Sequence, residues 1–476
     1  MINSSRKTKI VCTMGPASLK EDVLEKMFRA GMNVARFNFS HGTHEYHKEG
    51  MELVRRVRDR LKLPAAILLD TKGPEIRTGV LECGKIVLEK GQKFTLTTTQ
   101  GVGIAEAVSI TYEKLPRELK VGDRVLIDDG RIDLRVEELT DTDIICRVVT
   151  GGELSSRKGI NIPNAHLSMP YISEQDELDL RFGIEMDVDF VAASFVRSKN
   201  DVIELRKLLN YYGGHKIKII AKIENAEGVE NFDEILANCD GIMVARGDMG
   251  VEIEFERLPG IQKKFIRKCY QAGKMVITAT QMLETMIHSK TPTRAEITDV
   301  ANAVFDGTSA VMLSGETAMG DHPAHVVEVM AKIVTQAESD AIEMHVYEGV
   351  RYDADIFDMT NAICDAACTT ARDVKAKAII AVTSSGTTAR RVSKFRPSEA
   401  IVAATPDIKT YHQLALSWGV YPVLALIQDD TDKLFLHAID CARRLDIVSK
   451  GDKVVITAGV PLRQSGTTNL LKVQVV

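Results

Sequence analysis

Polar and charged residues follow several short β-branched runs, and their types suit catalysis. Lys222 and Glu224 end one such run two residues apart, and Arg246 and Asp248 follow the next run at the same spacing. Side chains alternate between the two faces of a strand, so each pair is expected to share one face, and neighbouring parallel strands lie about 5 Å apart. We therefore expect Glu224 and Asp248 to meet around one hard cation, Mg²⁺ or Mn²⁺, because carboxylate oxygens are suitable ligands for it. The alternative is that each carboxylate only pairs with a nearby Arg or Lys.

A second group of candidate ligands follows two earlier runs. Arg36, Asn38 and Ser40 alternate onto one face, and Asp70 and Thr71 end the adjacent run. Amide, hydroxyl and carboxylate oxygens with a single negative charge could hold a monovalent cation. A hydrogen-bonded network at the strand ends explains the same residues, and on spacing alone it is the preferred interpretation.

Three histidines invite a zinc interpretation. His41, His44 and His47 are three residues apart, and this step repeated twice swings side chains around a helix. We expect helix capping and solvent exposure instead of a zinc site.

A run of small hydroxyl residues follows a predicted strand and begins a helix. The run consists of Thr383, Ser384, Ser385, Gly386, Thr387 and Thr388. Backbone N–H groups at the start of a helix can hold a phosphate group. A second loop of Ser, Gly and Thr spans residues 465–468. Two such loops in one region favour an effector site for a phosphorylated metabolite over ordinary helix capping.

Eight β-branched runs alternate with amphipathic segments, which is typical of a parallel α/β fold. The runs are Lys9–Cys12, Val34–Phe39, Ala66–Leu69, Phe190–Ser194, Lys218–Ile223, Gly241–Ala245, Met275–Ala279 and Ala310–Leu313. Eight units fit a closed (β/α)8 TIM barrel, with an open doubly wound sheet as the competing architecture. Six of the runs end in polar residues. Because such barrels bind substrates at the carboxyl ends of their strands, this gathering predicts a catalytic site.

The rest of the sequence divides into two further regions. Residues 73–170 are rich in Gly, Thr and alternating Val or Ile, so we expect an inserted small β-barrel lid domain over the barrel mouth. Residues 343–476 alternate helices with four strands, which predicts a C-terminal α/β effector-binding domain. The catalytic barrel then comprises residues 1–72 and 171–342.

The composition excludes several classes of protein. Of 476 residues, 45% are hydrophobic and 27% charged, which is ordinary for a globular chain. A net charge of −5 offers no broad basic field for nucleic acid or anionic lipid. Eight cysteines without a CxxC pair do not form a disulfide scaffold, and the N-terminus lacks the apolar run of a signal peptide. We expect a reduced, cytoplasmic protein with no membrane span and no nucleic-acid partner.

Seven motifs together resemble those of the pyruvate kinase family. They are residues 8–18 (TKIVCTMGPAS), 32–42 (MNVARFNFSHG), 69–79 (LDTKGPEIRTG), 219–228 (IIAKIENAEG), 243–250 (MVARGDMG), 280–286 (TQMLETM) and 312–318 (MLSGETA). The resemblance covers essentially the whole chain. It implies a glycolytic phosphotransferase that moves the phosphoryl group of phosphoenolpyruvate to ADP, giving pyruvate and ATP. Spacing alone predicts only a metal-dependent barrel enzyme.

The resemblance implies roles for the charged residues. Lys222 and Arg36 would supply positive charge at the transferring phosphoryl group. A divalent cation on Glu224 and Asp248 would stabilise the enolate. Backbone N–H groups near Gly247 and Asp248 would hold the substrate carboxylate.

The resemblance further implies how the proton, the nucleotide and K⁺ are handled. Thr280 would bind substrate where the enolate carbon is protonated, with Ser314 and Glu316 as candidate relay members. The residues similar to nucleotide contacts are Asn38, His41, Arg77 and Lys158. The residues similar to a K⁺ site are Asn38, Ser40, Asp70 and the carbonyl of Thr71, which reverses the preference stated above. Glu75 agrees with K⁺ dependence, because K⁺-independent relatives tend to carry Lys there.

The family resemblance implies a homotetramer and allosteric control through the C-terminal domain. Basic residues in the phosphate turn of some relatives are replaced by Ser384 and Thr387, although Arg390 and Arg391 follow. The sequence therefore predicts a phosphorylated effector without identifying it. Two other functions stay open: an inactive relative that only senses metabolites, and a different barrel enzyme that acts on phosphoenolpyruvate.

Overall fold

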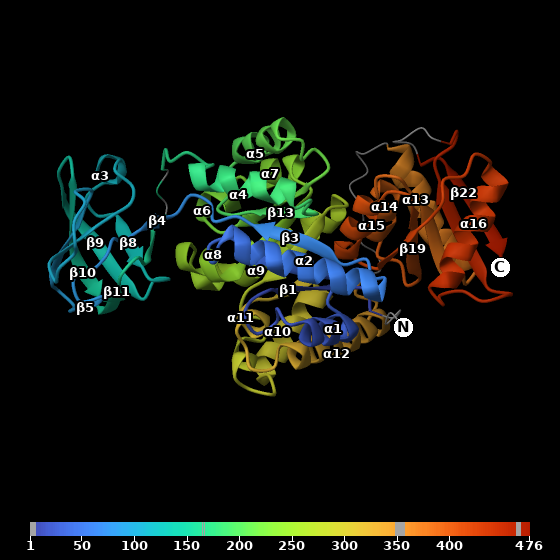
Figure 1. The fold of residues 1–476 in the computed structure, drawn as a ribbon, viewed down its shortest axis with the longest axis horizontal. Helices are drawn as coiled ribbons and strands as arrows, with labels where there is room; N and C mark the ends of the chain where they lie inside the picture. Colours follow the sequence, from blue (N-terminus) through green and yellow to red (C-terminus); the bar gives the residue numbers. More distant parts are fainter. Residues whose placement is uncertain (1–5, 164, 166, 348–357, 463–467) are drawn as a thin grey trace.

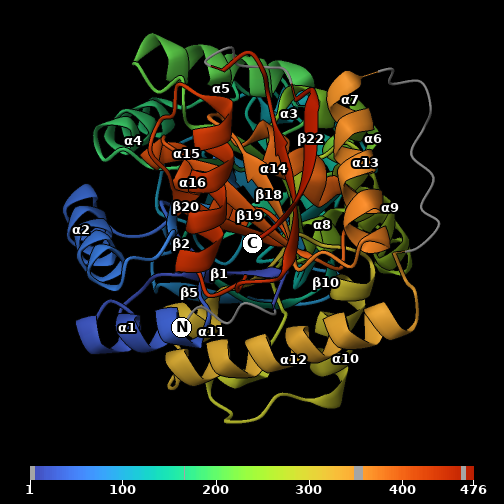
Figure 2. The same ribbon diagram turned by 90° about the vertical axis from the view of Figure 1, so that its right-hand side faces the viewer.

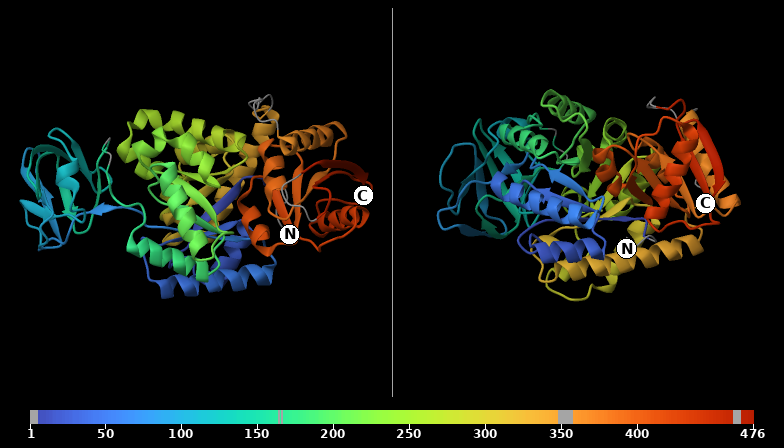
Figure 3. Two further views of the ribbon diagram at one scale, coloured as in Figure 1. Left: turned by 90° about the horizontal axis from the view of Figure 1, so that it is seen from above. Right: turned by 45° about the vertical axis from the view of Figure 1, so that its right-hand side comes forward.

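The computed structural model describes residues 6–163, 165, 167–347, 358–462 and 468–476. Three parts follow one another along its long axis: a β-rich lid, a central barrel and a C-terminal α/β domain (Figure 1). Figure 3 shows the same order from two other directions, with the lid projecting from one end of the barrel.

Eight parallel strands close into the central barrel in the order β1-β17-β16-β15-β14-β13-β3-β2. They are β1 (Lys9–Thr13), β2 (Val34–Asn38), β3 (Ala66–Asp70), β13 (Phe190–Ala193), β14 (Lys218–Ile223), β15 (Gly241–Ala245), β16 (Met275–Ala279) and β17 (Ala310–Leu313). The closed ring confirms the predicted (β/α)8 architecture and excludes the open sheet. Each strand agrees with its predicted run to within one residue at either end.

Helices cover the outside of the barrel. They are α1 (Glu21–Ala30), α2 (His44–Leu61), α4 (Glu174–Glu185), α5 (Lys199–Tyr211), α6 (Ala226–Glu230), α7 (Phe232–Asn238), α8 (Arg246–Glu252), α9 (Leu258–Gln271), α10 (Arg294–Phe305), α11 (Gly315–Ala318) and α12 (Pro323–Glu343), with 3₁₀ turns η1 (Phe255–Arg257) and η2 (Glu284–Ile287). Capping boxes at Ser173, Ser198 and Thr293 fix where α4, α5 and α10 begin. Among the described residues, no helix has the length and apolarity needed to cross a bilayer.

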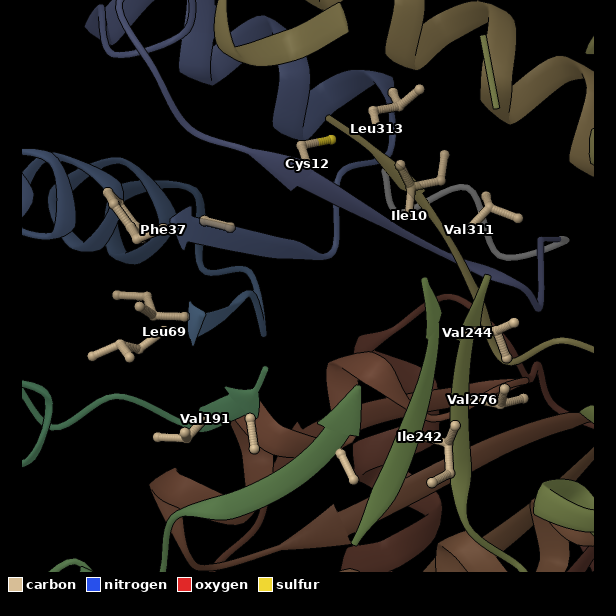
Figure 4. Packing of buried hydrophobic residues seen from close by; sticks show 14 of the residues in the cluster. Ile10, Cys12, Phe37, Leu69, Val191, Ile242, Val244, Val276, Val311 and Leu313 are labelled. Atoms are coloured by element: carbon tan, nitrogen blue, oxygen red, sulfur yellow. The ribbon is translucent and has the colours of Figure 1, made fainter. Parts of the chain in front are cut away.

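Strand alternation divides the core into two layers. Side chains such as Ile10, Phe37, Leu69 and Val191 point outward and pack under the helices (Figure 4). The alternate residues, including Val34, Leu68 and Ile220, fill the barrel interior. Their rows continue upward into polar residues, so the same alternation that builds the core brings the site residues into the barrel mouth.

The inserted lid is built mainly from antiparallel strands. Seven of them form one sheet in the order β4-β12-β8-β9-β10-β6-β7, and β11 pairs separately with β5. They are β4 (Ile76–Arg77), β5 (Lys85–Leu88), β6 (Lys93–Thr97), β7 (Ala107–Ser109), β8 (Arg124–Ile127), β9 (Ile132–Leu139), β10 (Asp143–Thr150), β11 (Gly152–Ser155) and β12 (Gly159–Asn161), with the short helix α3 (Leu115–Glu118). The β-rich character is as predicted. The sheet also closes into a small barrel, because Thr78 next to β4 forms an antiparallel bridge with Ile110 next to β7, while β11 and β5 form a separate ribbon. The β6–β7 pair is parallel.

The C-terminal domain is a five-stranded sheet flanked by helices, in the order β20-β19-β18-β21-β22. Its elements are α13 (Met359–Asp373), β18 (Ala378–Val382), α14 (Thr387–Lys394), β19 (Ala400–Thr405), α15 (Ile408–Gln413), η3 (Leu414–Leu416), β20 (Val420–Leu424), α16 (Thr431–Arg444), β21 (Lys453–Ala458) and β22 (Leu470–Val475). The sequence predicted four of these strands and missed β22, an antiparallel edge strand.

The lid and the C-terminal domain lie at opposite ends of the barrel. Leu416 of η3 packs into the barrel core, and Lys9 at the start of β1 donates to the carbonyl oxygen of Val420 at 2.7 Å. Figure 2 looks along the barrel from this end, with the C-terminal sheet in front. At the other end, Asn161 of the lid donates to Glu252 of α8 at 3.2 Å. The lid therefore stands at the carboxyl ends of the strands, where barrel active sites form.

Candidate active site

Four charged side chains meet inside the carboxyl end of the barrel. Lys222 Nζ lies 2.9 Å from Asp70 Oδ1 and 3.0 Å from Glu224 Oε1. Arg36 Nε lies 2.6 Å from Asp70 Oδ2. All four residues are buried, and Asp70 and Glu224 are almost completely inaccessible. Asp70 therefore bridges two cations that come from two different strands.

The strands explain why these residues converge. Arg36 is two residues beyond Val34, and Lys222 is two beyond Ile220, so each continues an inward-facing row of the barrel core. Asp70 follows Leu68 in the same way. The sequence spacing predicted these inward positions; the pairing of Asp70 with both cations appears only in the structure.

Electrostatics keep Lys222 and Asp70 ionised. Burial by itself opposes the charge of Lys222, but the carboxylates of Asp70 and Glu224 outweigh burial and raise the pKa of the ammonium. Burial likewise opposes ionisation of Asp70, and there the charges of Arg36 and Lys222 prevail and lower the pKa. A fixed ammonium and guanidinium inside a dry barrel mouth can stabilise a transferring phosphoryl group.

Glu224 and Asp248 form a pair of neighbouring acidic groups. Burial raises the pKa of Glu224 to about 7, and the negative charge of Asp248 adds to this effect, although Lys222 opposes it. Asp248 lines a cleft of about 240 Å³ between the lid and the barrel. Among the described residues no cluster of three His, Cys, Asp or Glu side chains forms a metal site. Two carboxylates, completed by water and substrate oxygens, fit the way in which Mg²⁺ is bound at phosphate-handling sites.

The expected strand face shared by Arg246 and Asp248 is wrong. Strand β15 ends at Ala245 and α8 begins at Arg246, so the two residues lie on a helical turn. Residues two apart on a helix point in different directions. Arg246 instead forms an ion pair with Asp299 at 2.7 Å, and Asp248 lines the cleft.

Thr280 and Gly247 come together next to this acidic pair. The Gly247 N–H donates to Thr280 Oγ1 at 2.9 Å, and Arg246 donates to the Thr280 carbonyl oxygen at 2.6 Å. Thr280 has a φ of 68° and Gln281 a φ of 55°. A β-branched residue in the left-handed region is strained, and such strain is concentrated at functional sites. No sequence pattern predicted this backbone conformation.

The candidate K⁺ ligands also lie near one another. Asn38 pairs with Asp70 in the register of β2 and β3. Asn38 Oδ1 accepts the Ser40 N–H at 3.2 Å, and the Thr71 carbonyl oxygen accepts the hydroxyl of Ser194 at 2.6 Å. Both the cation-site and the hydrogen-bond interpretations had predicted this gathering of oxygens. These hydrogen bonds are the ones expected of a network at the strand ends. The same oxygens are also suitable ligands for a monovalent cation.

Two of the candidate nucleotide contacts, Arg77 and Lys158, belong to the lid. Arg77 forms two hydrogen bonds to Glu75, at 2.8 and 2.9 Å, and Lys158 Nζ lies 2.7 Å from Asp128 Oδ1. His41 is exposed at the end of β2. Arg77 and Lys158 are neighbours in sequence of the cleft-lining residues Ile76 and Gly159, whereas His41 belongs to the loop between β2 and α2.

The predicted solvent exposure of the histidines is only partly right. Thr43 caps α2 by accepting the Tyr46 N–H, as expected for this segment. His47, however, is buried, stacks on Phe39 at 4.1 Å between ring centroids, and contacts the His41 carbonyl oxygen at 2.8 Å. The aromatic neighbours were not visible in the spacing.

Glu316 and Ser314 belong to the loop after β17. One Glu316 oxygen accepts the Leu283 N–H at 3.1 Å and the other accepts the Ser314 N–H at 2.6 Å. Burial raises the pKa of Glu316. Its carboxylate therefore joins two loops at the barrel mouth and holds the backbone that carries Ser314.

The predicted effector loop lines a cavity of about 360 Å³ in the C-terminal domain. Of the six predicted residues, those that line it are Thr383, Ser384, Ser385, Thr387 and Thr388. The Gly386 N–H is directed to Thr383 Oγ1 at 3.0 Å. Thr388 contacts Thr468 at 2.8 Å, which brings the second loop to the same cavity, while residues 465–467 lie outside the described residues.

Sequence reasoning missed two hydroxyl residues in the charged cluster. Ser194 Oγ accepts from Lys222 Nζ at 2.7 Å, and Thr13 Oγ1 accepts from Arg36 at 2.9 Å. Both continue inward-facing rows at strand ends. Their inward position at a strand end is the sequence signal for this role. It is a weak signal, because serine and threonine are common at strand ends.

The architecture and the site together define a class. A closed (β/α)8 barrel carries buried cations and a neighbouring acidic pair at its carboxyl end, beneath an inserted lid, as expected of a barrel enzyme that handles an anionic, metal-bound substrate.

Comparisons with known proteins identify the family within this class. The family model "Pyruvate kinase, barrel domain" matches residues 5–327, and "Pyruvate kinase, alpha/beta domain" matches residues 361–474. The chain is 48% identical over 472 residues to a pyruvate kinase of Clostridium acetobutylicum, covering 99% of this chain and 100% of that one. It is 48% identical to one of Staphylococcus haemolyticus, covering 80% of the relative. A crystal structure of a pyruvate kinase from Cryptosporidium parvum matches with a TM-score of 0.92 and 40% identity, covering 99% of this chain and 96% of that chain. The chain belongs to the pyruvate kinase family.

Proposed function

We propose that this chain transfers the phosphoryl group of phosphoenolpyruvate to ADP, giving pyruvate and ATP. In this reaction the bond between phosphorus and the enol oxygen breaks, a bond to the terminal ADP oxygen forms, and the enolate carbon takes up a proton. The observation that carries the proposal is the convergence of Lys222, Arg36 and Glu224 on Asp70 in the barrel mouth.

Lys222 and Arg36 hold the transferring phosphoryl group in line between its two oxygens. They act by their positive charges. Asp70 holds both side chains in place by forming an ion pair with each. Glu224 and Asp248 would hold Mg²⁺ or Mn²⁺, which supplies positive charge to the carboxylate and enolate oxygens. The backbone N–H groups near Gly247 and Asp248 bind the substrate carboxylate.

Thr280 lies on the strained turn and delivers the proton to the enolate carbon through water. Ser314 belongs to the same relay, and Glu316 fixes the loop on which Ser314 lies. Asn38, Ser40, Asp70 and the Thr71 carbonyl would hold K⁺. Asn38, His41, Arg77 and Lys158 bind the nucleotide phosphates, and closure of the lid then excludes water.

A phosphorylated metabolite regulates the enzyme from the C-terminal cavity, and the enzyme acts in the cytoplasm as a homotetramer. The hydroxyl-rich wall of the cavity, from Thr383 to Thr388, supports the regulatory part of this proposal. Replacing Thr387, which is exposed at the start of α14, by Glu should repel an anionic effector. Activation by sugar phosphates or nucleotides that survives in this variant would place the effector elsewhere.

The testing experiment is a steady-state assay of pyruvate formation with phosphoenolpyruvate, ADP, Mg²⁺ and K⁺. We expect turnover that requires ADP and both cations. Turnover without ADP would favour a different enzyme of phosphoenolpyruvate. Metabolite binding without any turnover would favour a sensor that has lost activity.

A further inference from the structure

Ser194 occupies a central position in the barrel mouth that the mechanism above leaves without a role. It follows β13 directly and continues the inward row of Phe190 and Ala192. Only 2% of its surface is exposed. The neighbouring loop packs closely on it, because a Cβ on Gly73 would lie 2.9 Å from the Ser194 Cβ. Its hydroxyl is thus held in one place by the fold.

The Ser194 hydroxyl makes contacts of two kinds. It accepts a hydrogen bond from Lys222 Nζ at 2.7 Å. It has two acceptors for its own proton, the Thr71 carbonyl oxygen at 2.6 Å and Asp70 Oδ1 at 3.1 Å. A hydroxyl has only one proton to donate, and the shorter contact assigns that proton to the Thr71 carbonyl. The result is a directed chain from the ammonium of Lys222 through Ser194 to the Thr71 carbonyl.

This chain fixes the direction of the Lys222 ammonium. The ammonium has three N–H groups, and Asp70 and Ser194 accept two of them. The third N–H is directed toward Glu224 Oε1 at 3.0 Å, on the side of the acidic pair. Ser194 differs from the two carboxylates because it accepts a hydrogen bond without neutralising the ammonium. It therefore orients the charge while leaving its strength intact.

The same hydroxyl also orients an oxygen of the proposed K⁺ site. A carbonyl oxygen has two lone pairs, so Thr71 can accept the Ser194 hydroxyl on one side and offer the other to a cation. The Thr71 side chain strengthens this link, since its Oγ1 accepts the Ser194 N–H at 3.2 Å. The two residues thus form a reciprocal pair between β3 and β13.

We propose that Ser194 is a positioning residue that aligns the Lys222 ammonium and the Thr71 carbonyl with each other, and so couples the monovalent-cation oxygens to the phosphoryl-binding lysine. The inference rests on the proposed phosphoryl transfer and deepens it. A loss of alignment affects the transition state more than the binding of phosphoenolpyruvate, because the substrate still meets the full charge of Lys222 and Arg36.

The test compares Ser194→Ala with a matched control, Ser309→Ala. Ser309 is also a buried barrel serine, but it lies at the opposite end and its Oγ accepts the Val276 N–H at 3.2 Å. For Ser194→Ala we expect kcat to fall about 10- to 100-fold, the factor that corresponds to one hydrogen bond to a charged group. We expect KM for phosphoenolpyruvate to change by less than about threefold and the half-saturating K⁺ concentration to rise. Ser309→Ala should keep the wild-type kcat and K⁺ dependence.

A second readout does not depend on turnover. We measure the thermal unfolding midpoint in KCl and in tetramethylammonium chloride, and expect K⁺ to stabilise the wild type and Ser309→Ala more than Ser194→Ala. Ser194→Cys, which retains a weak donor and acceptor, covers the case in which the alanine variant does not fold, and its kcat should lie between those of wild type and alanine.

The outcomes separate the two proposals. An inactive wild-type protein refutes the phosphoryl transfer itself. An active wild type whose folded Ser194→Ala variant, or Ser194→Cys if alanine does not fold, keeps kcat and K⁺ response refutes the role of Ser194. A lower unfolding midpoint with unchanged kinetics likewise overturns it, since a structural role alone explains that result.

Discussion

Replacing Lys222 by Met tests the charged cluster most directly. The ammonium makes contacts of 2.7, 2.9 and 3.0 Å to Ser194, Asp70 and Glu224. Methionine has a similar length but supplies neither the charge nor a donor. Removing one preorganised donor from a transition state costs about 3–4 kcal/mol, and a full buried charge should cost at least as much. We therefore expect kcat to fall by about 10³-fold or more.

The variant also leaves two carboxylates less well compensated. Asp70 keeps Arg36 at 2.6 Å, and Glu224 keeps the Phe195 N–H at 2.6 Å. Breaking a buried ion pair costs about 3–5 kcal/mol of stability, so the unfolding midpoint should fall as well. Activity must therefore be measured at a temperature where unfolding curves show the variant to be folded.

Lys218→Met is the matched control for this measurement. Lys218 lies at the other end of β14, partly exposed, with Nζ 2.9 Å from Asp240. The same substitution there should leave kcat within about twofold of wild type, since Lys218 begins β14 at the end away from the charged cluster. The assay follows pyruvate formation by coupled reduction with lactate dehydrogenase. A folded Lys222→Met protein with a tenth or more of wild-type turnover would refute the role assigned to this lysine.

Three other predictions follow from the same contacts and charges. Glu75→Lys replaces the partner of Arg77 by an ammonium, and we expect the KCl dependence of activity to weaken; an unchanged KCl titration would count against the link between Glu75 and K⁺. His412 is buried beside Arg58, Lys409 and Arg55, and burial followed by these charges lowers its pKa to about 3. Because the unfolded state binds more protons between pH 3 and 6.5, the free energy of unfolding should fall as the pH decreases through this range, by at most about 2 kcal/mol from pH 6.5 to 5. Urea unfolding at pH 7 and pH 5 should therefore show a smaller loss of stability for His412→Asn than for the wild type. Equal losses in the two proteins would contradict the lowered pKa of His412. Finally, phosphoenolpyruvate should raise the unfolding midpoint only when Mg²⁺ and K⁺ are present, and equal protection in EDTA and tetramethylammonium chloride would show that the chain alone binds the substrate.

The sequence predicted the barrel well because each of its strands is buried on both faces. Such strands read as continuous apolar runs, as in Phe190–Ala193 and Gly241–Ala245, where every residue is buried. The edge strand β22 (Leu470–Val475) has no such run, since its residues are partly or fully exposed. It was missed for this physical reason.

Within the site, the spacing predicted which residues face inward but not how the chain continues beyond each strand. Period two holds for Lys222, which lies inside β14. It fails for Asp248, because α8 begins one residue after β15 ends. Ser194 and Asp70 are 124 residues apart in the chain, so their contact depends on the closure of the whole barrel. Local patterns cannot predict a pairing of this kind.

The charge balance of the cluster explains why cations accompany this chemistry. Arg36 and Lys222 are paired with Asp70 and Glu224 in a buried network. Asp248 and Asp129 of the lid line the same cleft, and burial and then the nearby Asp248 raise the pKa of Asp129. Within this cluster, therefore, carboxylates accompany the two positive groups that the chain fixes in place. A divalent and a monovalent cation would reverse the sign of the local field without moving Arg36 or Lys222. The protein thus supplies direction through Asp70, while bound cations would supply the excess charge that the phosphoryl group requires.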